Sequence, residues 1–67
     1  MDTVERQELL ALVEELSRRY PEMRIGQLIA FSAFLAQGPI QSAVWDVEDD
    51  DLKRAIEEHL RKQKGEY

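Results

Sequence analysis

The chain has 67 residues, a formal net charge of −5 and no cysteine. This length allows one domain, residues 1–67, with a core of limited size. The lack of cysteine excludes disulfides and thiolate–zinc sites, and a single histidine, His59, argues against a histidine-based metal cluster. We therefore expect no metal and no cofactor, and self-association remains as a common source of added stability for so small a domain.

The start of the chain and its charge bear on location and partners. The N-terminal sequence MDTVERQELL lacks a basic stretch followed by an apolar core, so we expect no secretion signal. A cytoplasmic protein without cysteine fits this pattern. The acidic balance argues against a nonspecific grip on nucleic acid or anionic membrane, which requires clustered lysine and arginine. The short basic groups in the sequence are Arg18 with Arg19, and Arg61, Lys62 and Lys64.

Residues 2–20 are expected to form an amphipathic helix that Pro21 ends, because the residue before a proline is disfavoured in the helical conformation. Apolar residues recur there at three- and four-residue steps and so share one face: Leu9, Leu12, Val13, Leu16 and Tyr20. Four charged residues have the spacing of helix ion pairs: Glu14, Glu15, Arg18 and Arg19.

A second helix is expected to begin between Glu22 and Arg24 and to run to about Gln37. It is apolar nearly all round, which is typical of a helix surrounded by protein, so we place it in the middle of the domain. The uncharged run is long enough to suggest a membrane span. Its glutamines, and the Gly38-Pro39 pair that should stop the helix, favour a helix packed within a globular domain.

Gly26 lies near the start of this second helix, where glycine costs roughly 0.5–1 kcal/mol relative to alanine in a helix interior. Two interpretations stay open. Either the first helix approaches closely at this position, or the glycine simply occupies a loose first turn.

The connector GPIQSAVWDV, residues 38–47, is too apolar for a plain exposed linker. We expect it to fold back over the core as a lid, with a short helical turn at residues 40–44. The last helix is expected from about Glu48 to Lys64, with acids at its start and bases at its end that match the helix dipole. Its inward-facing residues are Leu52, Ala55, Ile56, His59, Leu60 and Gln63.

The acids of residues 46–57 resemble the spacing of a calcium-binding EF-hand loop. Loop position six, which requires glycine, is occupied here by Asp51, and position eight carries Lys53 in place of an apolar residue. The pattern therefore favours a solvated helix start. Because a catalytic carboxylate usually needs a pocket that shifts its pKa, and these acids lie on polar faces, we expect no enzyme.

The surplus of apolar residues is the clearest functional indication in the sequence. Three short helices cannot easily cover all of them, and exposed aromatic patches mark partner sites. The residues that we predict to contact a partner are Phe31, Phe34, Ile40, Trp45, Glu48 and Asp49. We expect a non-catalytic, acidic protein-interaction module, an accessory, inhibitor or antitoxin-like factor, which binds a protein partner or a second copy of itself.

A small helix-turn-helix regulator that binds DNA is the alternative. Residues 21–24 would form the turn, and the second helix would be the recognition helix. Such a helix presents Arg, Lys, Asn or Gln to base edges. This one offers Arg24, Gln27 and Gln37, with phenylalanines between them, so the alternative ranks second.

Residues 20–60 carry a pattern of YP-x-x-R-x-GQL, an apolar helix, a variable connector, and an aromatic residue before an ED-rich helix start. The matching pieces are Tyr20-Pro21, Arg24, Gly26-Gln27-Leu28, Trp45, and Glu48-Asp49. In this pattern the chain resembles a group of small helical proteins of bacteria and phages, except that Ile25 stands where the group has an aromatic residue.

The resemblance implies a compact helical domain, and it implies neither a reaction nor a substrate. A binding site shared by the group would involve Arg24, Gln27, Trp45 and Glu48. The other interpretation, which we favour, is that these residues hold the fold together, with Arg24 paired to Glu48 or Asp49.

Overall fold

The computed structural model describes residues 3–40 and 42–63, and this part of the chain contains helices and no strand. The helices are α1 (Thr3–Arg19), α2 (Ile25–Gln37), α3 (Ala43–Asp46) and α4 (Asp49–Lys62). The all-α prediction is therefore confirmed. The described part of the chain has four helices where the sequence predicted a three-helix domain, because the connector before α4 contains the short helix α3. A helical turn was expected in this connector at residues 40–44, and α3 begins three residues later, at Ala43.

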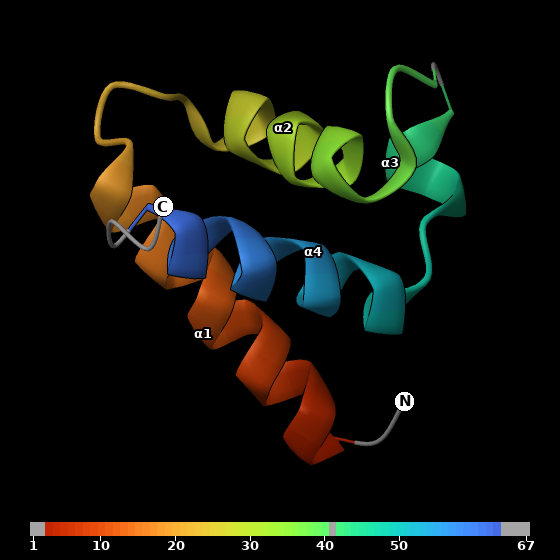
Figure 1. Cartoon of the computed structure of the whole chain (residues 1–67), viewed down its shortest axis with the longest axis horizontal. Helices are drawn as coiled ribbons and strands as arrows, with labels where there is room; N and C mark the ends of the chain where they lie inside the picture. The colour runs from red at the N-terminus through yellow and green to blue at the C-terminus, as the bar shows by residue number, and fades with distance from the viewer. Residues whose placement is uncertain (1–2, 41, 64–67) are drawn as a thin grey trace.

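The helix in the middle of the domain is α4, whereas the sequence pattern predicted α2. Figure 1 shows α4 lying between α2 on one side and α1 on the other, and α4 contacts both. α2 and α4 run in opposite directions, so the end of α2 lies near the start of α4. The sequence pattern did not reveal this arrangement, because an apolar composition does not show which helix lies between the others. α2 contacts α1, α3 and α4, yet it lies at the edge of this view and keeps one side exposed.

The core is small and lies where α1, α2 and α4 meet. Its buried residues are Leu9, Leu16, Leu28, Ile56 and Leu60. Partly buried residues pack around them, namely Leu12, Val13, Tyr20, Met23, Phe31 and Leu52. The apolar stripe predicted for α1 is confirmed by this arrangement. Of the described large apolar side chains, only Leu16, Leu28 and Ile56 are less than 2% exposed, as expected for a chain that buries a modest share of its surface.

Two ion pairs join α1 to α4 at the side of the core away from α2. Lys53 Nζ lies 2.9 Å from Glu8 Oε1, and Arg6 Nη2 lies 3.5 Å from Asp49 Oδ2. The hydrogen bond from Lys53 to Glu8 raises the pKa of that lysine above its usual value. These pairs connect the N-terminal halves of two helices whose apolar faces meet in the core.

α2 has defined ends that agree with the sequence. The backbone N–H of Arg24 donates to Gln27 Oε1 at 2.8 Å before the first turn. The helix ends at Gly38, whose φ of 80° is a conformation that glycine adopts readily, and whose N–H donates to the Phe34 carbonyl. Inside the helix, the Ser32 hydroxyl donates to the Leu28 carbonyl at 2.9 Å, the back-bond typical of a buried serine.

Thirteen residues of α helix are about 20 Å long, well short of a hydrocarbon layer of about 30 Å. Within the described residues, none of the helices combines the length and apolar character that a membrane crossing requires. The stop at Gly38 that the sequence predicted is what limits this helix.

α2 is covered on one side only. Leu28, Ser32 and Ala33 are buried, whereas Ile25 and Phe34 are 63% and 50% exposed. We expected protein to surround this helix, either neighbouring segments of the chain or a second copy of it; the chain itself covers one side only. The chain has too few elements to cover a helix that is apolar on every side.

The structure also decides between the two interpretations of Gly26. A Cβ atom placed on Gly26 would meet nothing within 4 Å, so no helix of this chain approaches closely there. The glycine occupies an open first turn on the outside of the domain.

Candidate functional site

The most distinctive surface of the molecule is an exposed apolar face formed by α2, the connector and α3. Its members are the large apolar residues of this region that are at least 45% exposed: Ile25, Ile29, Phe34, Ile40, Val44 and Trp45. We call this set the apolar face. Trp45 is the extreme case, with 92% of its surface exposed. Single exposed apolar residues are normal in proteins, but six on adjoining elements are not.

Helix geometry explains how α2 contributes to the apolar face. Ile29 and Phe34 are five residues apart, which puts them about 140° apart around the helix. Ala30 lies between them and is exposed, whereas Ala33, which also lies between them, is buried. Gln27 is exposed beside Phe34, so the outer surface of α2 is mainly, but not wholly, apolar. The opposite side carries Leu28 and Ser32 into the core.

α3 determines how the connector is oriented. Ala43 points inward and is only 4% exposed, while its neighbours Val44 and Trp45 are 54% and 92% exposed. Consecutive residues of a helix point in different directions, so burying the small Ala43 turns the two larger side chains outward. The connector was predicted to cover the core as a lid with Ile40, Val44, Trp45 and Val47. Val47 is half-buried, but Ile40, Val44 and Trp45 are exposed, so the prediction is wrong for these three.

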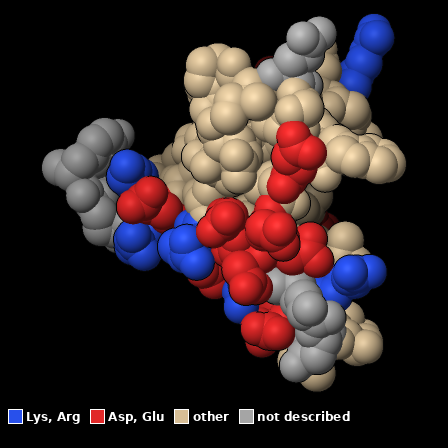
Figure 2. Space-filling view, turned by 90° about the vertical axis from the view of Figure 1, so that its right-hand side faces the viewer, with Lys and Arg blue, Asp and Glu red and all other residues tan. Residues whose placement is uncertain are grey.

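An acidic edge lies directly beside the apolar face, where α3 meets the start of α4. We define it by its five carboxylates: Asp46, Glu48, Asp49, Asp50 and Asp51. Figure 2 shows acidic side chains gathered in one area, with a wide surface of uncharged residues adjoining it. A shallow hollow of about 300 Å³ is lined by residues 45–50, so Trp45 belongs to both surfaces.

The acids of this edge are partly engaged within the chain. Asp46 accepts a hydrogen bond of 2.6 Å from the Ser42 hydroxyl, and Asp49 pairs with Arg6. Asp51 pairs with Arg54 at 3.2 Å on the same helix. The positive end of the α4 dipole stabilises acids in its first turn, as the sequence predicted.

Four of the six residues predicted to contact a partner lie together on this surface. Phe34, Ile40, Trp45 and Glu48 are all exposed. Asp49 is half-buried because it faces Arg6. Phe31 does not belong to the surface, because its ring packs edge-on against Tyr20 and His59, with centroids 5.6 Å and 5.3 Å apart.

Arg24 does not pair with the acidic start of α4 as the sequence pattern suggested. It precedes α2, whereas Glu48 and Asp49 lie beyond the opposite end of that helix. Figure 1 shows these two ends of α2 on opposite sides of the molecule. Because α2 and α4 are antiparallel, the start of α2 lies away from the start of α4, and Arg24 is therefore distant from Glu48 and Asp49.

A polar cluster around His59 is the feature that sequence reasoning recognised only in part. The Tyr20 hydroxyl lies 2.8 Å from His59 Nε2 and also accepts a hydrogen bond from the Gln63 amide. Burial, followed by the positive charges of Lys62 and Arg19, lowers the pKa of His59. The inward position of His59 and Gln63 was predictable from helix periodicity, but their common partner Tyr20 was not.

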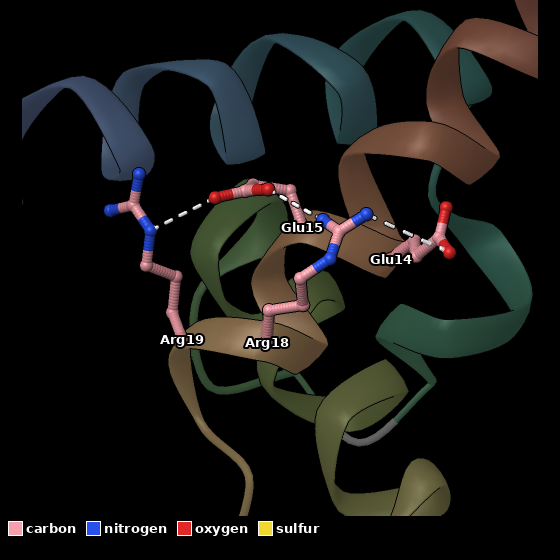
Figure 3. Close-up of polar contacts among 4 residues, drawn as sticks. All are labelled: Glu14, Glu15, Arg18 and Arg19. Carbon is pink, nitrogen blue, oxygen red and sulfur yellow. Dashed lines mark hydrogen bonds and ion pairs between the residues drawn. The ribbon is translucent and has the colours of Figure 1, made fainter.

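The basic residues at the end of α1 are neutralised by acids on the same helix. Glu15 lies between two guanidinium groups, 2.6 Å from Arg18 Nη1 and 3.1 Å from Arg19 Nε (Figure 3). Glu14 lies 3.7 Å from the second Nη of Arg18. The ion pairs predicted from the four-residue spacing are therefore confirmed, and this basic group is compensated within the chain.

The calcium interpretation of residues 46–57 meets a structural obstacle. From Asp49 onward this segment is α-helical, so most of the positions of an EF-hand loop are wound into a helix. Across residues 3–40 and 42–63, no group of three acidic or histidine side chains is placed to hold a metal ion.

The resemblance of residues 20–60 to small bacterial and phage proteins rests on the motif alone and stays a prediction. Comparisons of the chain with protein-family models, with curated proteins and with solved structures gave no match.

Proposed function

We propose that this chain is a non-catalytic protein-interaction module that binds another protein chain through the apolar face and the acidic edge. The observation that carries the proposal is the position of Trp45, which is 92% exposed at the junction of the two surfaces. Tryptophan is the residue most enriched among the side chains that dominate binding energy at interfaces. An exposed tryptophan with apolar neighbours and a charged border has the layout of such a site.

The chemistry of the surface indicates what kind of partner it fits. The apolar face favours an apolar surface of similar width, such as one side of a helix. The acidic edge favours lysine or arginine at the border of that surface, because opposite charges steer association and fix the orientation of the partner. An accessory, inhibitor or antitoxin-like factor acts by contacts of this kind. The partner is either a different protein or a second copy of this chain.

DNA binding remains the second candidate, and two features weigh against it. The exposed residues of α2, the candidate recognition helix, include one side chain that reads base edges, Gln27; the others are Ile25, Gly26, Ile29, Ala30 and Phe34. Arg18 and Arg19, the basic group nearest to it in sequence, are paired with acids. A DNA-binding form would show an affinity for duplex DNA that falls steeply with salt. A titration without a salt-dependent change removes this candidate.

The proposal is tested by affinity capture from the native cell at the endogenous level, with Trp45→Ala as the variant and Leu10→Ala as the matched control. Leu10 is a large apolar residue of α1 that is 61% exposed, so its truncation removes a similar amount of apolar surface elsewhere. We expect the wild type and Leu10→Ala to recover the same protein chain, either a different protein or an untagged copy, and Trp45→Ala to recover much less. Equal recovery by all three forms, or recovery of nothing, contradicts the proposal.

A further inference from the structure

α2 differs from its neighbours in how its charges match the helix dipole. α1 and α4 have acids in the first turn and bases in the last turn, the arrangement that stabilises each helix. α2 has neither an acid at its start nor a base at its end, and Arg24 precedes its positive end. Its two ends therefore carry uncompensated charge of opposite sign, positive at Arg24 and negative at the C-terminal carbonyls.

The side chains near these ends continue the same separation of charge. In the described part of the chain, no carboxylate lies within 4.0 Å of the Arg24 guanidinium. Glu48 and Asp50, on the acidic edge, likewise have no ion pair there. The apolar face thus runs from a basic end at Arg24 to an acidic end at Glu48.

We propose that the occupant of the apolar face is a second copy of this chain, with the two α2 helices packed antiparallel about a two-fold axis near Ala30. This dimer rests on the proposed function, and it identifies the partner of the interaction module as a second copy of the chain. A surface that is basic at one end and acidic at the other complements itself when it is turned by 180°. A two-fold interface has this property, because each residue contact occurs twice with the roles exchanged.

In this arrangement Arg24 of one copy lies beside the end of α2, Trp45 and Glu48 of the other copy. The guanidinium then faces the negative end of a helix dipole, a carboxylate and an indole ring, all of which attract it. The outer side of α2 also permits a close approach, since the positions around Gly26 are open and Ala30 has a small side chain. A standard interface buries about 800 Å² per partner. That is a minor share of the 5062 Å² that the chain exposes.

The dimer is tested by exchanging the two charges. Sedimentation equilibrium from micromolar to millimolar concentration measures the dimerisation of four forms: the wild type, Arg24→Glu, Glu48→Arg and the double variant. Arg24→Glu places an acid at the start of α2, which favours the folded monomer. We nevertheless expect it to weaken dimerisation by about tenfold or more, because like charges then meet across the interface.

The double variant is the decisive form. Arg24 and Glu48 lie at opposite ends of α2 within one chain, so their charges interact at short range only between copies. We expect Arg24→Glu with Glu48→Arg to restore most of the dimerisation that each single change removes. Arg18→Glu, with the same change of net charge on α1 and at a position outside the apolar face and the acidic edge, is the control and should dimerise as the wild type does. Thermal melts by circular dichroism verify that each form is folded.

The outcomes separate this inference from the function on which it rests. A wild type that stays monomeric at millimolar concentration overturns the dimer, as does a double variant no better than the two single changes combined. If such a monomer still captures a different protein in a Trp45-dependent manner, the interaction module stands and only its partner was wrongly assigned. If it captures nothing, both proposals fail.

Discussion

The Tyr20 hydroxyl oxygen lies 2.8 Å from Nε2 of His59, which joins the residue after α1 to the last turn of α4. The rings of the two residues also stack, with centroids 6.0 Å apart. Phe31 of α2 packs edge-on against both rings. One small cluster therefore connects all three long helices, and it contains the only histidine of the chain.

The position of His59 predicts how the domain responds to acid. Burial, with the charges of Lys62 and Arg19, lowers the pKa of this residue below its usual 6.5. Below pH 6.5 the unfolded chain then binds more protons at this site than the folded chain, so the free energy of unfolding falls as the pH falls through the folded pKa. The contribution of neutral, buried His59 to the free energy of unfolding is fully present above pH 6.5.

Proton NMR measures the pKa of His59 directly, because the C2 proton of a single histidine gives one titration curve. We expect a midpoint below 6.5 in the folded protein. A midpoint at or above 6.5 contradicts the burial argument. In His59→Gln, the free energy of unfolding should lose the part of its pH dependence that lies just below pH 6.5, between the folded and unfolded pKa of this residue.

Removing the Tyr20 hydroxyl should destabilise the fold. Tyr20→Phe keeps the ring packing and deletes the group shared by His59 and Gln63, which loses about 1 kcal/mol of stability. Urea unfolding at pH 7 measures the difference. Ser42→Ala, which removes an exposed hydroxyl bonded to Asp46, is the matched control and should change stability by less. Equal effects of the two substitutions would show that the cluster contributes no more than a surface contact.

The two glycines that the structure describes should respond to alanine in opposite directions. Gly38 has a φ of 80° and a ψ of −166°, a region that is costly for other residues, so Gly38→Ala should destabilise the domain by about 1–3 kcal/mol. Gly26 lies in a helix with open space around it, so Gly26→Ala should stabilise the monomer by about 0.5–1 kcal/mol. Melting temperatures at low protein concentration provide the test, and a change of the same sign at both positions contradicts it.

Truncation of Ile56 should have the largest effect of any apolar substitution on α4. The side chain is 0% exposed, and isoleucine-to-alanine changes in cores cost about 2–5 kcal/mol. A domain of this size has only a few kcal/mol of margin, so we expect Ile56→Ala to lose its cooperative thermal transition. Ile56→Val should cost about 0.5–1.5 kcal/mol and remain folded. The control is Val4→Ala, at a position 62% exposed, which should melt close to the wild type.

Local chemistry accounts for the parts of the fold that the sequence predicted well. Pro21 and Gly38 restrict the backbone at single positions, and they limit α1 and α2 wherever the helices lie. The four-residue spacing from Glu15 to Arg19 places their side chains on one side of any helix. For the same reason the acids at the start of α4 were correctly assigned to the positive end of a helix dipole.

Partner choice between helices was not predictable in the same way. The pattern of α2 shows that it is apolar on every side, but it does not show how many sides the chain can cover. Phe31 and Phe34 are three residues apart in one helix, yet one packs in the core cluster and the other is half exposed. Which of them faces inward depends on where α4 lies, and α4 is more than ten residues further along the chain.

The amino-acid sequence by itself determined where α1 ends, where α2 begins and ends, where α4 begins, and which charges stabilise these helices, because these features depend on backbone sterics and on neighbours within one or two turns. The tertiary structure alone decided that α4 is central, that Ala43 rather than Trp45 is buried, and that Arg24 and Glu48 lie at opposite ends of one apolar face. Those outcomes depend on competition among distant segments for a small core, and on the antiparallel course of α2 and α4.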